Sequence, residues 1–213
     1  DFNSALENAV FGAVITLNKD IAGPVTIDKS ITIKGNGHSI KASGADTAVT
    51  IDADDVRLFN VNAESEHGIA LIVNEGKKNP TIEGGAYKTC TQEGGYAEDY
   101  GKQGEGAIRI MGNNGDITVK DTILVGGLHV IARTSGELTV EGNTICFDYA
   151  GKTPLVGVLI NGAYDDVDMD VVAENNTIAV PNENSFYIQF SDSAWGNQIC
   201  ISANDSVAKI GTN

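Results

Sequence analysis

Short runs of alternating apolar and polar residues follow one another along most of this chain. Residues 25–27, 31–33, 117–119 and 138–140 each place two branched apolar side chains on either side of a threonine. A period of two is that of a β-strand with one buried face. Gly, Asn and Asp are frequent between the runs, so the pattern predicts many short strands joined by tight turns.

The runs recur as pairs, and this repetition predicts the fold. One type joins an apolar run, a turn and a second small apolar run, as in residues 31–40, 117–124 and 138–145; the other type follows and often opens with glycine. A repeat of about 21 residues cannot close its own core, so the next coil must cover its inward side chains. A turn-forming residue, suited to the left-handed conformation, recurs at the bend: Asn36, Asn60, Gly84, Asp121, Asn143 and Asn176.

We therefore predict an all-β fold, a right-handed parallel β-helix, with residues 1–213 as a single domain and residues 14–210 as its coils. About six or seven coils fit the paired repeats. A β-sandwich is the alternative, but its strands should be evenly spaced without a paired repeat. Residues 90–105 interrupt the repeat as the largest loop insertion.

Residues 2–13 differ from the rest, since Phe2 and Leu6 lie four positions apart, near the period of an α-helix. Asn3 or Ser4 fits as the N-cap of this segment. The end of a solenoid exposes an apolar edge. We expect residues 2–13 to form a short capping helix over the first coil.

Composition narrows the class of protein. Hydrophobic residues make up 41% of the 213 positions but aromatic residues only 6%, so the core must consist mainly of Ile, Val, Leu and Ala. The formal net charge of −15 argues against nucleic acid as a partner. No apolar run is long enough to insert into a membrane. Cys90, Cys146 and Cys200 are too few and too widely spaced for a disulfide framework or a zinc site, and their pairing stays open.

One stretch resembles a known family. Residues 5–40 read ALENAVFGAVITLNKDIAGPVTIDKSITIKGNGHSI. They resemble the N-terminal coils of the pectate lyase-like β-helix superfamily, in particular its non-catalytic, adhesin-like members on bacterial cell surfaces. The cap helix, the ITL strand and the phrase PVTIDKSITIKGNGHSI carry the resemblance, which covers the rest of the chain only as the repeat pattern. It implies a secreted or cell-surface location, and Asp1 in place of Met fits a mature chain without its signal peptide.

The catalytic motifs of that superfamily are not found here. Its polygalacturonases use Asn-Thr-Asp, Asp-Asp, Gly-His-Gly and Arg-Ile-Lys, and its pectate lyases use a calcium-binding acidic cluster with a catalytic Arg or Lys. In this chain His38 lies in Gly-His-Ser, and Arg109 is followed by Ile and Met. We carry over the fold and assign no catalytic residue.

Outward-facing side chains on one set of strands form a candidate ligand-binding strip. If Ile108 and Ile110 point inward, Arg109 points outward, because faces alternate along a strand. A planar guanidinium and aromatic rings suit sugar recognition. The candidates on or beside these strands are Arg109, His129, Arg133, Asn161, Tyr187 and Gln189, and those in the insertion are Tyr96, Glu98, Asp99 and Tyr100.

Three alternating acidic residues are the candidate metal ligands. Asp166, Asp168 and Asp170 would project to one side of a strand, where they could hold Ca²⁺, although the spaced calcium-loop motif is absent. We expect no other cofactor. The sequence favours a secreted or cell-surface domain that binds glycans or extracellular matrix, as a monomer or as part of a larger surface protein. A lyase or hydrolase acting on acidic polysaccharide is the first alternative, and a structural spacer is the second.

Overall fold

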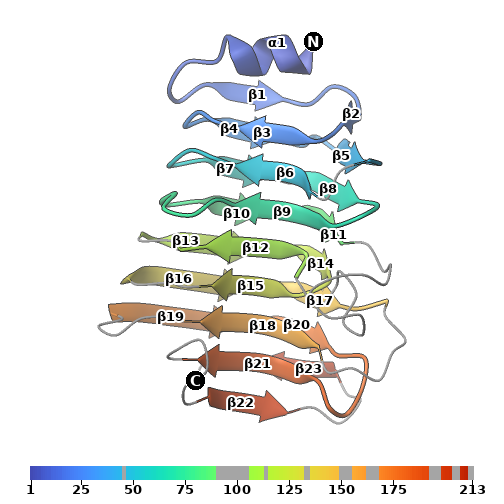
Figure 1. Cartoon of the computed structure of the whole chain (residues 1–213), viewed down its shortest axis with the longest axis vertical. Coiled ribbons are helices and arrows are strands. Elements are labelled where there is room, and N and C mark those ends of the chain that lie inside the picture. Colours follow the sequence, from blue (N-terminus) through green and yellow to red (C-terminus); the bar gives the residue numbers. More distant parts are fainter. Residues whose placement is uncertain are drawn as a thin grey trace.

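A computed structural model describes residues 1–44, 47–89, 106–112, 115–131, 135–148, 155–161, 168–191, 198–202 and 207–210. These residues form one helix, α1 (Phe2–Glu7), and strands β1 to β23. The strands wind into a right-handed parallel β-helix with α1 at its N-terminal end, as the sequence predicts (Figure 1).

Each coil gives one strand to each of three sheets, taken in the chain order A, B, C. Sheet A contains β1 (Val14–Thr16), β4 (Thr32–Lys34), β7 (Arg57–Phe59), β10 (Thr81–Glu83), β13 (Ile117–Lys120), β16 (Ser135–Glu141) and β19 (Asp168–Glu174). Sheet B contains β2 (Ile21–Ala22), β5 (Ser39–Ala42), β8 (Asn62–Ser65), β11 (Ala86–Lys88), β14 (Ile123–Val125), β17 (Thr144–Cys146), β20 (Asn176–Ala179) and β23 (Val207–Ile210). Sheet C contains β3 (Val25–Ile27), β6 (Thr47–Ile51), β9 (Ile69–Val73), β12 (Ile108–Met111), β15 (Leu128–Ile131), β18 (Val156–Asn161), β21 (Phe186–Ser191) and β22 (Gln198–Ser202).

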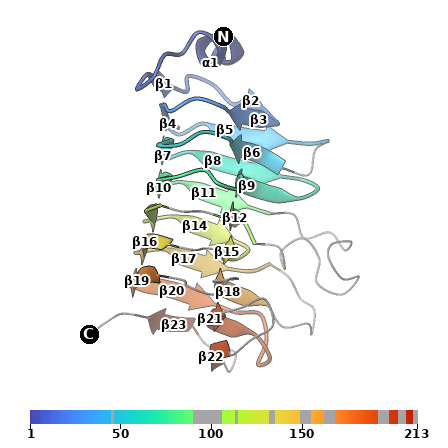
Figure 2. The same cartoon turned by 60° about the vertical axis from the view of Figure 1, so that its left-hand side comes forward.

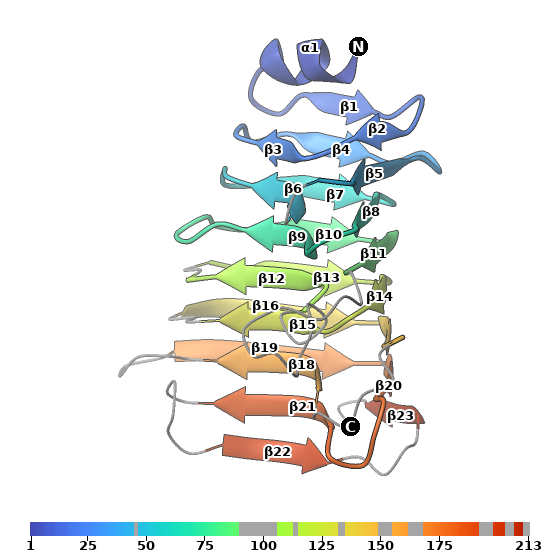
Figure 3. The same ribbon diagram turned by 45° about the vertical axis from the view of Figure 1, so that its right-hand side comes forward.

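The three sheets enclose one apolar interior. Sheet C lies in front of sheet A in Figure 1, and sheet B closes the side that comes forward in Figure 3. Inward side chains stack in register from coil to coil, so that Leu58 lies between Ile33 and Ile82, all without exposed surface. In Figure 2 the coils follow one another from α1 downward as a single stack. Residues that share a register position therefore form columns along the axis.

The turn from sheet A to sheet B follows the prediction in the first coils and departs from it in the last. Left-handed φ angles occur at four of the predicted positions: Asn36, Asn60, Gly84 and Asp121. In the two later coils the left-handed residues are Gly142 and Asn175, so Asn143 and Asn176 instead point inward and are buried. Asn143 Nδ2 donates to Asn176 Oδ1 at 2.9 Å, and Thr122 Oγ1 donates to Asn143 Oδ1 at 2.7 Å. The predicted turn residues thus become a buried polar ladder.

The capping helix is shorter than predicted. It ends at Glu7 rather than at residue 13, because Lys29 Nζ donates to the carbonyl of Leu6 at 3.0 Å and also to that of Glu7. Its N-cap is Asp1, whose carboxylate accepts from the Ser4 amide at 2.9 Å, and not Asn3 or Ser4 as predicted. Within the described residues no helix has the length and apolar character needed to cross a membrane.

The C-terminal strands depart from the predicted coil pattern. The β22 strand pairs antiparallel with β21, and β23 pairs antiparallel with β20. The reversal is visible in Figure 1, where β22 points opposite to β21. The parallel coils therefore extend to β21, and the last two strands do not continue them to residue 210.

Candidate functional site

The outer face of sheet C carries the predicted strip. Strand pairing aligns one outward position from each coil: Thr26, Thr50, Ile72, Arg109, His129, Leu159 and Gln189, called here the sheet C strip. Neighbouring strands lie about 4.8 Å apart, so these residues form a continuous line along the axis. The alternation of Ile108 and Ile110 as buried and Arg109 as half-buried confirms the predicted facing.

Arg109 is the unusual member of this line. Its side chain is half-buried, and its Nε is shielded from solvent without a hydrogen-bond partner. Nor does any carboxylate among the described residues pair with Arg109, although the chain carries 29 acidic residues against 14 basic ones. An unpaired buried N–H has a desolvation cost that a carboxylate ligand would remove.

His129, the next residue in the strip, is less open than expected. It is only 4% exposed, and its Nε2 lies 3.4 Å from the carbonyl oxygen of Val156. Two glycines make room for the ring, since a Cβ at Gly106 would lie 3.0 Å from the imidazole Cγ and one at Gly127 would lie 2.9 Å from Nε2. Burial, with a smaller contribution from the nearby charge of Arg109, lowers the pKa of His129 to about 4. The ring is therefore neutral at physiological pH.

The other predicted ligand contacts fall into two groups. Tyr187 is only 7% exposed, so its ring is buried and is not presented as an open aromatic surface. Gln189 is half-buried in the strip, and Asn161 lies on β18 opposite Ser191 of β21. The remaining candidates lie outside the described residues: Arg133, Tyr96, Glu98, Asp99 and Tyr100.

The insertion at residues 90–105 leaves and rejoins the helix next to the strip. Its two flanking residues meet, because Thr89 Oγ1 donates to the Gly106 carbonyl at 3.2 Å. The strand that carries Arg109 begins at Ile108, directly after this junction. Arg109, which has no hydrogen-bond or ion-pair partner among the described residues, therefore lies three residues after this junction.

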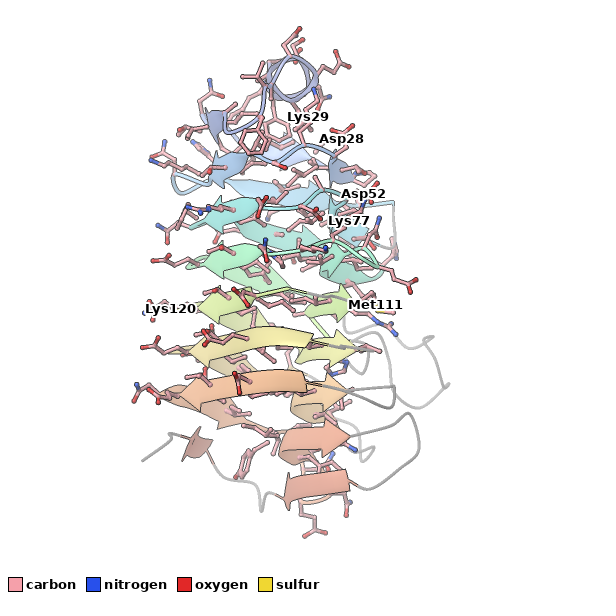
Figure 4. All side chains as sticks on the ribbon, turned by 90° about the vertical axis from the view of Figure 1, so that its left-hand side faces the viewer. Asp28, Lys29, Asp52, Lys77, Met111 and Lys120 are labelled. Atoms are coloured by element: carbon pink, nitrogen blue, oxygen red, sulfur yellow. The ribbon has the colours of Figure 1, made fainter. Side chains whose placement is uncertain are left out.

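A polar cluster adjoins the strip at the ends of the preceding strands. Asp52 Oδ1 accepts from Asn74 Nδ2 at 3.1 Å and lies 3.2 Å from Lys77 Nζ. The hydrogen bond from Asn74 and then that from Lys77 lower the pKa of Asp52, so it stays ionised. Figure 4 shows Asp52 and Lys77 on the same side as Met111 and opposite Lys120, which extends from sheet A. Asp52 and Lys77 therefore lie beside the N-terminal part of the strip, and the half-buried Met111 and Ile131 lie two positions along the strands from Arg109 and His129.

The predicted metal ligands stay a prediction, because the side chains of Asp166 and Asp168 lie outside the described residues. Asp168 and Asp170 lie on β19, where Asp170 is exposed, and Asp166 lies outside the described residues. No group of three His, Cys, Asp or Glu side chains within ion-binding reach occurs in the described part of the chain. Cys146 is a half-buried free thiol whose pKa is raised by burial, and Cys90 lies outside the described residues.

A second set of side chains was not predicted. Phe59, Asn60 and Glu83 line a hollow at the corner between sheets A and B, away from the sheet C strip. The adjacent Gly84-Gly85 pair was the available sequence signal for it.

Neither protein-family models, nor curated proteins, nor solved structures match this chain.

Proposed function

We propose that this chain is a secreted or cell-surface binding domain that holds an acidic glycan along the sheet C strip. The observation that carries the proposal is the half-buried Arg109 guanidinium, which has no partner among the described residues. A guanidinium binds a carboxylate through two parallel hydrogen bonds, so a uronate is the ligand group that it fits best.

The surroundings of Arg109 support an extended ligand. Ile72 and Leu159 offer half-buried apolar surface on either side along the strip, against which the faces of sugar rings can pack. Lys77 adds a second cation beyond Ile72, one coil toward the N-terminus, although Asp52 partly neutralises it. A chain of uronates lying along the axis would meet Arg109 near its middle.

The assignment to the pectate lyase-like superfamily is part of this proposal. It rests on residues 5–40 and is supported by the parallel three-sheet coil, which is the architecture that the resemblance implies. With it comes the expectation of a bacterial, secreted and carbohydrate-rich setting. Fold alone does not specify activity, so the binding function has to be tested at the residue level.

The test compares wild type with Arg109→Gln in binding to polygalacturonate and alginate at low and high salt. We expect the variant to bind at least tenfold more weakly, because a charge-assisted hydrogen-bond pair contributes about 1.5–3 kcal/mol. Arg57→Gln is the matched control, since Arg57 is exposed on sheet A and its loss changes the net charge equally. Equal binding by wild type and Arg109→Gln would contradict the proposal.

The same samples separate the alternative functions. New reducing ends or unsaturated products, with or without added Ca²⁺, would identify a hydrolase or lyase instead of a binding domain. Absence of both turnover and binding to all acidic polysaccharides would favour the structural spacer.

A further inference from the structure

The corner between sheets A and B contains a hollow that the strip does not account for. A cavity of about 340 Å³ lies between coils there, within the size range of ligand sites. Phe59, Asn60 and Glu83 lie on its sheet A side, and Ala86 and Ile123 on its sheet B side. A second hollow on the N-terminal side of Phe59 is lined by Thr16 and Lys34 and shares Phe59 and Asn60 with the first.

Local sequence explains why the corner is hollow. Gly84 and Gly85 both have left-handed φ angles at the turn. A Cβ at Gly85 would lie 2.1 Å from the carbonyl oxygen of Val61, so this turn packs directly on the backbone of the coil before it. The Asn60 side chain takes the space beside Gly84, where a Cβ would lie 2.1 Å from Asn60 Oδ1. With only a methyl group at Ala86, the outer corner between Asn60 and Ile123 stays hollow.

Phe59 gives the groove an aromatic surface. It is half-buried on the outer face of β7, in register with Lys34 on one side and Glu83 on the other. The other described members of that column are polar or charged: Thr16, Lys34, Glu83, Lys120, Glu141 and Glu174. An exposed ring face among polar groups is the arrangement against which the apolar face of a sugar packs.

The polar groups around Phe59 are only weakly engaged elsewhere: the charges of Glu83 and Asp121 help to raise the pKa of Lys120. The side chains of Asn60, Glu83 and Asp121 make no hydrogen bond or ion pair within the described part of the chain. An amide both donates and accepts, and a carboxylate accepts, so together they match the hydroxyl groups of a sugar. Lys34 and Lys120 lie beside the carboxylates of Glu83 and Asp121, so the groove offers a polyanion no net positive charge. The ligand class indicated is therefore uncharged.

We infer that the groove from Thr16 to Asp121 is a second carbohydrate site, for an uncharged glycan lying parallel to the helix axis. It spans four coil steps, about 19 Å at the usual strand spacing, which suits an extended chain and not a single sugar. The site lies on the opposite side of the coil from Arg109 and does not depend on the function of the sheet C strip.

The experiment titrates the whole chain with cellohexaose, xylohexaose, mannohexaose and an oligogalacturonate, by calorimetry and by ligand-observed NMR. We expect saturable binding of at least one uncharged hexasaccharide. Phe59→Ala should weaken it about tenfold, because aromatic packing and the apolar area of the ring are lost. Phe59→Trp should restore binding, and Ala86→Leu should abolish it by filling the hollow from a half-buried strand position.

Two matched variants serve as controls. Phe11→Ala removes a phenylalanine that is 82% exposed and lies outside the groove, so it should bind like wild type. Arg109→Gln should also leave uncharged-glycan binding unchanged, which separates this site from the sheet C strip. Thermal unfolding followed by circular dichroism verifies that each variant is folded.

Three results would overturn the inference. One is that no uncharged hexasaccharide binds. Another is that Phe59→Ala and Ala86→Leu, both folded, bind like wild type. The third is that only the oligogalacturonate binds at the groove, which would refute the ligand class.

Discussion

Tyr87 places a phenol inside an otherwise apolar column. The side chain has no exposed surface, and its hydroxyl has no hydrogen-bond partner among the residues that the structure describes. Burial raises the pKa of this phenol, so the hydroxyl stays neutral. In the register of sheet B, Tyr87 follows Ala63 and precedes Leu124. The small Ala63 gives room for the ring, but nothing in the column satisfies the hydroxyl.

We predict that Tyr87→Phe stabilises the protein. Removing an unsatisfied buried hydroxyl while keeping the ring should raise the free energy of unfolding by about 1 kcal/mol. Urea denaturation followed by circular dichroism measures the change. Tyr87→Ala is the contrasting variant, because a cavity should lower the stability by about 3 kcal/mol. A loss of stability in Tyr87→Phe would show that the hydroxyl has a partner.

His129 makes stability depend on pH. The unfolded chain takes up a proton on this ring near pH 6.5, whereas the folded chain does so only near pH 4. Between these values the unfolded state binds more protons, so the stabilisation is complete above about pH 6.5 and is lost as the pH falls toward about 4. The loss should be on the order of 3 kcal/mol.

Urea unfolding measured at several pH values tests this linkage. The slope of stability against pH in that window should become shallower in His129→Gln. The matched control is His67→Gln, because His67 is an exposed histidine. An unchanged slope in His129→Gln would refute the assignment.

At the residue scale, the sequence correctly predicted on which face of a strand a side chain lies, but not how exposed that side chain is. Strand alternation correctly placed Arg109 outward. The burial of His129 depends on Gly127, in the turn before its own strand, and on Gly106, in the preceding coil. From the sequence, such glycines indicated only where a strand begins. Likewise, the local strand pattern could not show that Arg109 lacks a partner among the described residues, because that depends on side chains from other coils.

At the scale of the element, the buried ladder Thr122–Asn143–Asn176 joins successive turns. Asn143 Nδ2 also donates to the Val119 carbonyl at 2.9 Å, and Asn176 Nδ2 donates to the Val140 carbonyl at 2.8 Å. Each amide therefore satisfies backbone groups of the coil before it. Fully satisfied buried networks of this kind fix one arrangement of the chain.

We predict that Asn143→Ala destabilises the protein by about 2–4 kcal/mol, because it leaves several buried groups unpaired at once. Chemical denaturation gives the value. Thr144→Ala is the neighbouring control, since Thr144 is exposed on β17 and should change the stability by less than about 0.5 kcal/mol. Similar effects of the two substitutions would argue against the ladder.

The boundaries of strands and helices were predicted well where the sequence repeat determines them. They were predicted poorly where a contact from elsewhere in the chain determines them. The predicted repeats that begin at residues 31 and 117 start within one residue of β4 and β13, whereas the one that begins at residue 138 starts three residues after the beginning of β16. The helix boundary failed because Lys29, from the turn after β3, ends α1 at Glu7. The predicted turn positions of Asn143 and Asn176 were wrong, because Gly142 and Asn175 adopt the left-handed conformation there and both Asn side chains point inward.

For the whole molecule, stacking makes stability depend on neighbours. Each coil packs only on those before and after it, so the terminal coils should open before the central ones. Lys29→Met removes the ammonium that joins α1 to the first coils. We predict faster amide hydrogen exchange in β1 to β3, with about 1 kcal/mol lost there, and unchanged protection in β10 to β15.

Hydrogen exchange with mass spectrometry resolves these segments. Lys19→Met is the control, because Lys19 is exposed near the same end and makes no hydrogen bond within the described residues. Uniform loss of protection along the stack would contradict the neighbour-only picture.

The two reversed strands at the C-terminal end bear on self-association. A filament of identical copies grows when, in all three sheets at once, the last strand of one molecule pairs with the first strand of the next. Within the described part of the chain, sheet A ends on β19, which runs with its sheet, whereas sheets B and C end on the antiparallel strands β23 and β22. No single orientation of a second copy could extend all three ladders in the same sense. The end of the stack is therefore a barrier to head-to-tail polymerisation.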